Sequence, residues 1–270
     1  MPHPTRVALI TGCGKPIGIG NSTARALAAA GVTVVVSDVA PAGVANEHNV
    51  QGDMDPNWGG LDSLVEAITQ TGGTASAAIG SVSVEADAAR MVDEVLRRYG
   101  RLDILVNNAG APQGADRNEI EDVPVAAWDL TMGVNARGCF LMSRAAVPAM
   151  RKAGWGRIVS VSSRAAFRPG PRRVAYAASK AAIVGMTKTI ARGYAGEGIL
   201  CFGVAPGFTV SEMTADYLQG RGGAQIVADI PLGRVASTDE VAEVIRWLAT
   251  EAPASATGSV IDVNGASYVR

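Results

Sequence analysis

The sequence predicts an α/β fold in which a doubly wound parallel β-sheet carries helices on both faces. Short apolar runs typical of buried strands alternate strictly with longer segments of helical periodicity along most of the chain. A glycine-rich turn joins the first of these strands to the first helix, as is common in parallel sheets. No repeat or composition shift divides the 270 residues, so we expect a single domain spanning 1–270.

Composition narrows the possible functional classes. The chain is 48% hydrophobic with a net charge of -1, which argues against nucleic acid as the main partner. Apolar runs are short and broken by glycine, so no membrane span is expected, and no signal peptide precedes the first strand. Three widely spaced cysteines favour a reducing, cytoplasmic location. The histidines, His3 and His48, lie outside the predicted core, so neither a metal site nor a His-centred triad is expected.

The first half of the chain supplies alternating strands and helices. The strands are short runs rich in apolar and β-branched residues, predicted at 6–11, 32–38, 74–79 and 102–106. The helices have apolar residues at helical spacing and end near glycines, and they are predicted at 21–31, 61–70 and 85–99. Residues 39–60 are polar and lack periodicity, which predicts a surface insertion between the second strand and the second helix.

The second half continues this alternation with longer helices. Helices are predicted at 128–152, 175–197 and 238–248, the last with Ser237 or Thr238 as its N-cap. Strands are predicted at 157–162, 200–205 and 257–263. Residues 208–230 are less regular and follow the pair Pro206-Gly207.

The glycine-rich turn at 12–20 is a candidate anion site. A strand, a turn of this kind and a helix N-terminus together bind the pyrophosphate of a dinucleotide. Asp38 ends the next strand, eighteen residues after Gly20, where a carboxylate accepts hydrogen bonds from ribose hydroxyls and repels a 2′-phosphate. We therefore expect NAD rather than NADP, although Asp38 could be an ordinary turn residue and Lys15 could meet a 2′-phosphate.

A second constellation suits proton transfer to or from an oxygen. Tyr176 and Lys180 are four residues apart and share one face of a predicted helix. A nearby ammonium favours the phenolate form of a tyrosine, which fits that side chain for acid–base work. Ser163 follows the preceding strand and could hold a carbonyl oxygen against the tyrosine hydroxyl. The alternative is a buried tyrosine beside a solvated lysine.

Together these motifs resemble the short-chain dehydrogenase/reductase family over nearly the whole chain. Ser163 precedes Tyr176 by thirteen residues, which is the spacing usual in that family. The other matches, in the family's order, are the turn 12–20, Asp38, Asn107-Asn108-Ala109-Gly110, Asn135, Lys180, Pro206-Gly207, Ser211-x-Met213, Pro231 to Arg234 and Thr257-Gly258.

The resemblance implies a Rossmann-type fold and an NAD-dependent oxidoreductase that interconverts a secondary alcohol and its ketone by hydride transfer. Tyr176 would transfer the proton, Lys180 would assist it and bind the nicotinamide ribose, Ser163 would orient the substrate oxygen, and Asn135 would hold a relay water. Residues 208–230 would form a lid over substrate, and a homotetramer or dimer is implied. The implied cofactor-binding residues are Gly12, Gly14, Gly18, Ile19, Gly20, Asp38, Asn108, Ala109, Gly110, Tyr176, Lys180, Pro206, Gly207 and Ser211.

The turn departs from the family pattern. Gly14, Gly18 and Gly20 fit the usual glycine spacing, but Thr11-Gly12 then lies two residues too far upstream. The turn is therefore longer than usual, and which amides meet the pyrophosphate stays open. Ser81-Val82 stands where the family usually has an aspartate that touches adenine.

Two other functions remain open. One is an NADPH-dependent 3-ketoacyl-type reductase, which Asp38 disfavours, and the other is a dinucleotide-binding protein without turnover. The substrate is expected to be a small molecule, and the arginines between Ser163 and Tyr176 suggest that it is anionic, because a guanidinium fork suits an oxyanion. Arg168 and Arg173 are the predicted pocket-facing pair, the alternative being that this loop lies in solvent or at a subunit interface.

Overall fold

A seven-stranded parallel sheet forms the centre of the computed structural model, which describes residues 5–44, 57–211 and 223–270. Its strand order, β3-β2-β1-β4-β5-β6-β7, confirms the predicted doubly wound topology because the winding reverses between β1 and β4. Residues 45–56 of the predicted insertion 39–60 and residues 212–222 of the segment 208–230 lie outside the described residues, as do His3, His48 and Met213. The strands are β1 Val7–Thr11, β2 Thr33–Asp38, β3 Ala75–Ile79, β4 Ile104–Asn107, β5 Gly156–Val161, β6 Ile199–Pro206 and β7 Val260–Val263.

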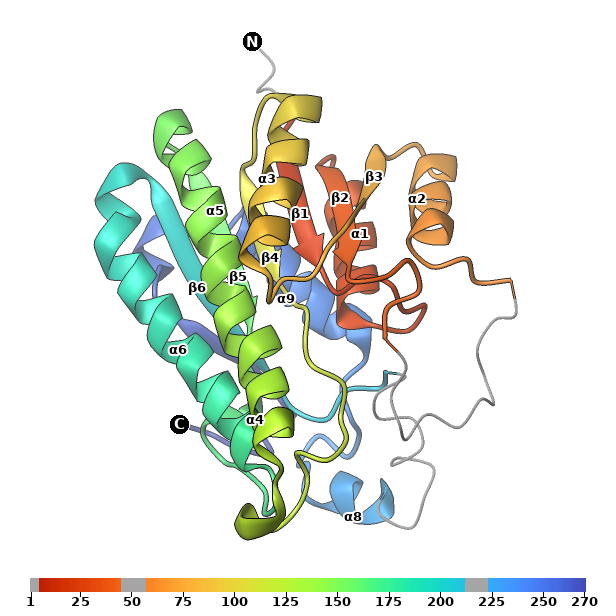
Figure 1. Ribbon diagram of the computed structural model, residues 1–270, viewed down its shortest axis with the longest axis vertical. Coiled ribbons are helices and arrows are strands. Elements are labelled where there is room, and N and C mark those ends of the chain that lie inside the picture. Colours follow the sequence, from red (N-terminus) through yellow and green to blue (C-terminus); the bar gives the residue numbers. More distant parts are fainter. Residues whose placement is uncertain (1–4, 45–56, 212–222) are drawn as a thin grey trace.

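Helices cover both faces of this sheet (Figure 1). Alternate residues of one strand enter opposite cores: Ala8 and Ile10 pack with α1, α2 and α9, whereas Val7 and Leu9 pack with α3 and α5. A strand buried on both faces reads as a continuous apolar run, which is why the sequence revealed it. The main helices are α1 Ile19–Ala29, α2 Leu61–Gln70, α3 Glu85–Tyr99, α4 Val125–Met132, α5 Gly138–Ala153, α6 Val174–Tyr194, α8 Gly223–Ala228 and α9 Thr238–Thr250.

The predicted helix at 128–152 is more complex than its periodicity indicated. It begins earlier, as α4, and a π-helical turn, Gly133–Arg137, joins α4 to α5. A π-turn inserts an extra residue into the helical ladder, and no side-chain pattern reports it.

The end of the chain also differs, since the last strand begins at Val260 rather than at 257. At α9, Ser237 is the N-cap and forms a capping box with Glu240.

The carboxyl ends of the central strands meet at one edge of the sheet. There β1 leads to Gly12, β2 ends at Asp38, and β5 leads to Ser162 and Ser163. In open α/β sheets ligands bind at this edge, at the point where the strand order reverses. The fold therefore assembles the glycine turn and the predicted catalytic residues at one place. Within the described residues, no helix combines the length and the apolar character needed to cross a bilayer.

Candidate active site

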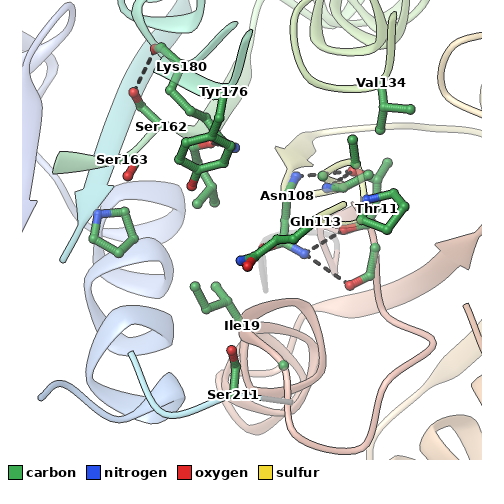
Figure 2. A pocket seen from close by; sticks show the side chains of 18 of the residues that line it. Thr11, Ile19, Asn108, Gln113, Val134, Ser162, Ser163, Tyr176, Lys180 and Ser211 are labelled. Atoms are coloured by element: carbon green, nitrogen blue, oxygen red, sulfur yellow. Dashed lines mark hydrogen bonds between the residues drawn. The ribbon is translucent and has the colours of Figure 1, made fainter. Parts of the chain in front are cut away.

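A cavity of about 750 Å³ opens at this edge of the sheet. Tyr176, Lys180, Ser162 and Ser163 gather on one side of it, facing Thr11, Asn108 and Gln113 across the space, with Ile19 and Ser211 nearby (Figure 2). These residues come from the ends of β1, β4, β5 and β6 and from the first turns of α1 and α6. The glycine turn and the Ser–Tyr–Lys set thus line the same space.

Lys180 is fixed beside Tyr176 by contacts with the end of β5. Its ammonium is 5.7 Å from the centroid of the Tyr176 ring and donates a hydrogen bond to the Val161 carbonyl at 2.9 Å. The Ser162 hydroxyl donates to the Lys180 carbonyl at 2.8 Å, which ties α6 to the strand (Figure 2). Lys180 is only 5% exposed, so its charge acts in a poorly solvated region where Coulombic effects are strong. The Ser163 hydroxyl accepts a hydrogen bond from the Ala165 amide at 3.1 Å.

Asn135 lies in the π-helical turn behind the cavity wall and does not line the cavity itself. Its side-chain oxygen accepts from the Ala111 amide at 2.8 Å, and its side-chain nitrogen donates to the Ser179 hydroxyl at 2.9 Å. Ser179 in turn donates to the Tyr176 carbonyl at 2.8 Å. The Asn135 side chain therefore connects the loop after β4 to the turn of α6 that carries Tyr176.

The glycines of the turn serve different purposes. A Cβ at Gly20 would lie 2.3 Å from the Gly12 carbonyl oxygen, so Gly20 is needed for packing within the protein. Gly12 has a φ of +75°, and a Cβ there would lie 2.8 Å from the Ala109 Cα. A Cβ at Gly18 would meet nothing nearer than 3.7 Å, although Gly18 lines the cavity. No described protein atom crowds a side chain at Gly18, so the space beside it is open to a dinucleotide pyrophosphate.

The lengthened part of the turn closes over Asp38. The Gly14 amide donates to one Asp38 carboxylate oxygen at 2.9 Å, and the Val39 amide donates to the other at 2.8 Å. The Trp58 indole donates to the Gly14 carbonyl at 2.8 Å and holds this segment in place. Burial raises the pKa of the Asp38 carboxyl, and the two amides and Lys15 oppose that rise.

Most of the predicted site residues line the cavity, but Gly14, Gly20 and Asn135 do not. Gly14 does not line the cavity because its amide faces Asp38, and Gly20 packs against Gly12 and Asn108 instead. Asn108 braces the turn by donating to the Thr11 and Gly12 carbonyls at 2.9 and 3.0 Å. The predicted residues that line the cavity are Gly12, Gly18, Ile19, Asp38, Asn108, Ala109, Gly110, Ser163, Arg168, Arg173, Tyr176, Lys180, Pro206, Gly207 and Ser211.

Sequence reasoning missed several lining residues on the loops after β4 and β6. Gln113 and Arg117 follow the Asn-Ala-Gly motif, Leu130 and Val134 come from α4 and the π-turn, and Phe208 follows Pro206-Gly207. Neither periodicity nor a motif distinguishes them from ordinary loop and helix residues. The proximity of Phe208 to Pro206-Gly207 was the one available signal.

Three of the four arginines after Ser163 have acidic partners from distant parts of the chain. Arg164 contacts Asp229 at 3.2 Å, and Arg168 contacts both Asp229 oxygens at 3.2 and 3.3 Å and the Ser267 carbonyl at 2.5 Å. Arg172 contacts Glu119 at 2.6 Å. The loop is therefore less positive than its own sequence indicated, and the contacts of Arg168 disfavour that residue as a substrate ligand.

Comparison with known proteins places this site among oxidoreductases. The family model described as enoyl-(acyl carrier protein) reductase matches residues 12–266. The chain is 36% identical to the 3-oxoacyl-[acyl-carrier-protein] reductase FabG of Thermotoga maritima, with 96% of each chain covered. It is 34% identical to a 3-oxoacyl-[acyl-carrier-protein] reductase of Synechocystis sp., again with 96% of each covered.

A solved structure agrees with these relatives. It is a protein of Beutenbergia cavernae, provisionally assigned as an NAD(P)-dependent gluconate 5-dehydrogenase and holding NADP at low occupancy. The TM-score is 0.83 and the sequence identity 32%, with 96% of this chain and 95% of the other covered. The family-model match, over residues 12–266, includes the glycine turn and the Ser–Tyr–Lys segment. The chain belongs to the short-chain dehydrogenase/reductase family of oxidoreductases.

Proposed function

We propose that the chain, acting as a single domain, is an NAD-dependent oxidoreductase that interconverts a secondary alcohol and its ketone. The observation that carries the proposal is one cavity lined by the glycine turn, Asp38, Ser163, Tyr176 and Lys180. Such a cavity lets a dinucleotide and a small alcohol lie side by side. The buried Lys180 ammonium lies 5.7 Å from the centroid of the Tyr176 ring, an arrangement suited to proton transfer.

In the oxidative direction the chain's residues remove one proton from the alcohol. The Tyr176 oxygen accepts the hydroxyl proton of the alcohol, and the Lys180 ammonium stabilises the phenolate before that transfer. Ser163 donates a hydrogen bond to the substrate oxygen and keeps it against Tyr176. A bound nicotinamide dinucleotide supplies the hydride acceptor. In the reductive direction Tyr176 returns the proton to the carbonyl oxygen, and Asn135 supports the helix that carries Tyr176.

The preference for NAD rests on the carboxylate of Asp38. It lines the cavity at the end of β2 and keeps lone pairs for ribose hydroxyls beyond those that the Gly14 and Val39 amides occupy. Lys15 lies close to it and reduces the repulsion of a 2′-phosphate, and a similar protein holds NADP. We expect kcat/KM to be higher with NAD than with NADP. The Asp38→Asn variant keeps a hydrogen-bond acceptor but removes the charge, so the ratio of kcat/KM with NAD to kcat/KM with NADP should fall at least tenfold. Equal kcat/KM with NAD and NADP in the wild type would contradict this preference.

The second candidate is an NADPH-dependent 3-ketoacyl-type reductase. Its support is the name of the similar proteins from Thermotoga maritima and Synechocystis sp.. Reduction of a 3-ketoacyl thioester with NADPH, at a kcat/KM above that for every simple ketone tested, would favour this candidate.

The experiment that tests the leading proposal is a screen of NAD and NADP reduction by purified protein. The alcohols would include simple secondary alcohols, polyols and hydroxy acids, and the reverse reaction would use the matching ketones. Turnover that depends on Tyr176 supports the proposal. Binding of dinucleotide without turnover of any alcohol or ketone in the panel would favour a non-catalytic protein.

We also propose a homo-oligomer, a tetramer or dimer, in the cytoplasm. Phe140 on α5 and Trp247 on α9 are 50% and 37% exposed, and a subunit contact over these helices would remove both apolar side chains from water. All three cysteines are buried and unpaired, which suits a reducing compartment. Light scattering of the purified protein tests the oligomer. Of the predicted lid 208–230, residues 212–222 lie outside the described residues, while Phe208 lines the cavity and Asp229 contacts Arg164, which lines it too.

A further inference from the structure

Among the described residues, the substrate end of the cavity holds more positive charge than the neighbouring carboxylates neutralise. We propose, resting on the oxidoreductase function above, that the substrate is an anion whose carboxylate or phosphate group is bound by Arg164 and Arg173. The reacting alcohol or ketone would lie against Ser163 and Tyr176, with the anionic group directed toward the two guanidinium groups. Hydroxy acids, keto acids and their phosphorylated counterparts have this chemistry.

Arg164 is the guanidinium nearest to Ser163 in the sequence, and it is largely buried. The side chain is 16% exposed, lines the cavity and lies over the ring of Phe208 at 5.5 Å from the centroid. Its one hydrogen bond to a described carboxylate is to Asp229 at 3.2 Å. A guanidinium has five N–H donors, and a charge removed from water needs partners for most of them. An oxyanion in the cavity could provide those partners.

Asp229 does not balance the charge around it. Arg168 contacts both of its oxygens, so one carboxylate serves two guanidinium groups. The hydrogen bond from Arg164, together with Arg168, holds the pKa of the Asp229 carboxyl below its usual range. Arg168 also donates to the Ser267 carbonyl, so more of its N–H groups have protein partners than those of Arg164 do. A surplus positive charge therefore remains on the side of Arg164.

Arg173 adds a second guanidinium to the lining of the same cavity. It is half-buried and precedes the first residue of α6. Within the described residues it forms no ion pair, whereas its neighbour Arg172 pairs with Glu119. No side chain caps the N-terminus of α6, so that end of the helix also favours an anion.

No acidic residue within the described cavity lining offsets these charges at the substrate end. Asp38 is the acidic lining residue, and it stands at the end of β2, whereas Ser163 follows β5. In the sheet order β2-β1-β4-β5 these two strands are three spacings apart, or about 14 Å. A neutral substrate would leave these two guanidinium groups without an anionic partner in the cavity that they line.

The test compares hydroxy acids and hydroxyalkyl phosphates with neutral isosteres, the primary amide for each carboxylate and the methyl ether for each phosphate. We expect wild-type kcat/KM to favour the anion by at least tenfold. Arg164→Gln and Arg173→Gln should each reduce the anion-to-neutral ratio at least tenfold while keeping turnover of the neutral compound. Arg172→Gln, whose guanidinium pairs with Glu119, is the matched control and should leave the ratio unchanged.

Asp229→Asn gives a prediction of opposite sign. Removing the carboxylate that competes for Arg164 should lower KM for the anion and leave KM for the neutral compound unchanged. If Arg164 and Asp229 were merely structural partners, the variant would instead impair both substrates equally, and the proposal would fail.

Thermal-shift titration with the same pairs of compounds measures binding independently of turnover. Anions that raise Tm more than their isosteres in wild type but not in Arg164→Gln would support the proposal even if no alcohol were oxidised, and the oxidoreductase function alone would then fail. Turnover of neutral and anionic compounds with equal kcat/KM, unchanged in both arginine variants, would overturn the anion proposal and leave the oxidoreductase function standing. The anion proposal would also be overturned if anion and isostere gave the same kcat/KM and the same change in Tm.

Discussion

Two alanine substitutions in the glycine turn should have opposite consequences. Gly18 has an extended backbone, with φ -152° and ψ 151°, and a Cβ there would find no protein atom within 3.7 Å. Gly18→Ala should therefore leave the fold intact and change its stability by less than about 1 kcal/mol, because alanine restricts the unfolded chain but is a poorer N-cap of α1 than glycine. At Gly20 the new Cβ would lie 2.3 Å from the Gly12 carbonyl oxygen and 2.6 Å from the Asn108 side-chain nitrogen. Such overpacking costs about 1–3 kcal/mol.

Gly18→Ala should weaken cofactor binding even though the fold tolerates it. The methyl group of Gly18→Ala would extend toward the cavity that Gly18 lines, so it would obstruct a pyrophosphate there. We expect Kd for NADH to rise at least tenfold, which corresponds to about 1.4 kcal/mol. Calorimetric titration gives Kd, and a thermal melt gives Tm, with about 2–4 °C expected for each kcal/mol in a chain of this size. If Gly18→Ala bound NADH and NADPH as tightly as wild type, the pyrophosphate could not lie at this turn.

Three other substitutions test separate parts of the structure. Lys180→Ala should lower kcat and also weaken cofactor binding, and a loss of kcat with unchanged Kd for NADH would contradict its double role. Asp103 is fully buried, accepts from the Val7 amide and pairs with the partly exposed Arg101 at 2.7 and 2.8 Å, so Asp103→Asn should cost about 1–3 kcal/mol in urea unfolding. Hydrogen bonds from Arg234 and from the Ser237 amide lower the pKa of Glu240 from 4.5 to about 2, so its stabilisation is present above pH 4.5 and lost as pH falls to about 2. Glu240→Gln should flatten the pH dependence of stability within that window, and an unchanged slope would contradict the capping role.

The fold was predictable because each central strand and helix follows a simple rule. β1 and β2 are buried on both faces, so their apolar residues are contiguous, and the amphipathic helix α3 ends at Gly100 in the left-handed conformation. The placement of the proposed catalytic set was predictable because Tyr176 and Lys180 are close in sequence and share one helix face. Ser163 is brought to them by a strand end, which topology fixes.

Other features depend on contacts between distant residues and leave no local pattern. The π-helical turn around Asn135 changes no periodicity that a sequence displays. The partners of Arg164 and Arg172 are 65 and 53 residues away, so the charge balance of their loop could not be deduced from the loop itself. The engagement of Asp38 by the Gly14 amide arises from two additional residues in the turn, whose path only the folded chain reveals.

The central claim is that the Tyr176 oxygen transfers the proton in a dinucleotide-dependent oxidation or reduction. The most direct measurement compares Tyr176→Phe with wild type in both kcat and Kd for NADH, with Tyr194→Phe, near the far end of the same helix, as the control. We expect Tyr176→Phe to lose turnover almost completely with Kd within twofold of wild type, because only the reacting oxygen is removed, and Tyr194→Phe to retain both. Retention of more than a tenth of wild-type kcat by Tyr176→Phe would contradict the account.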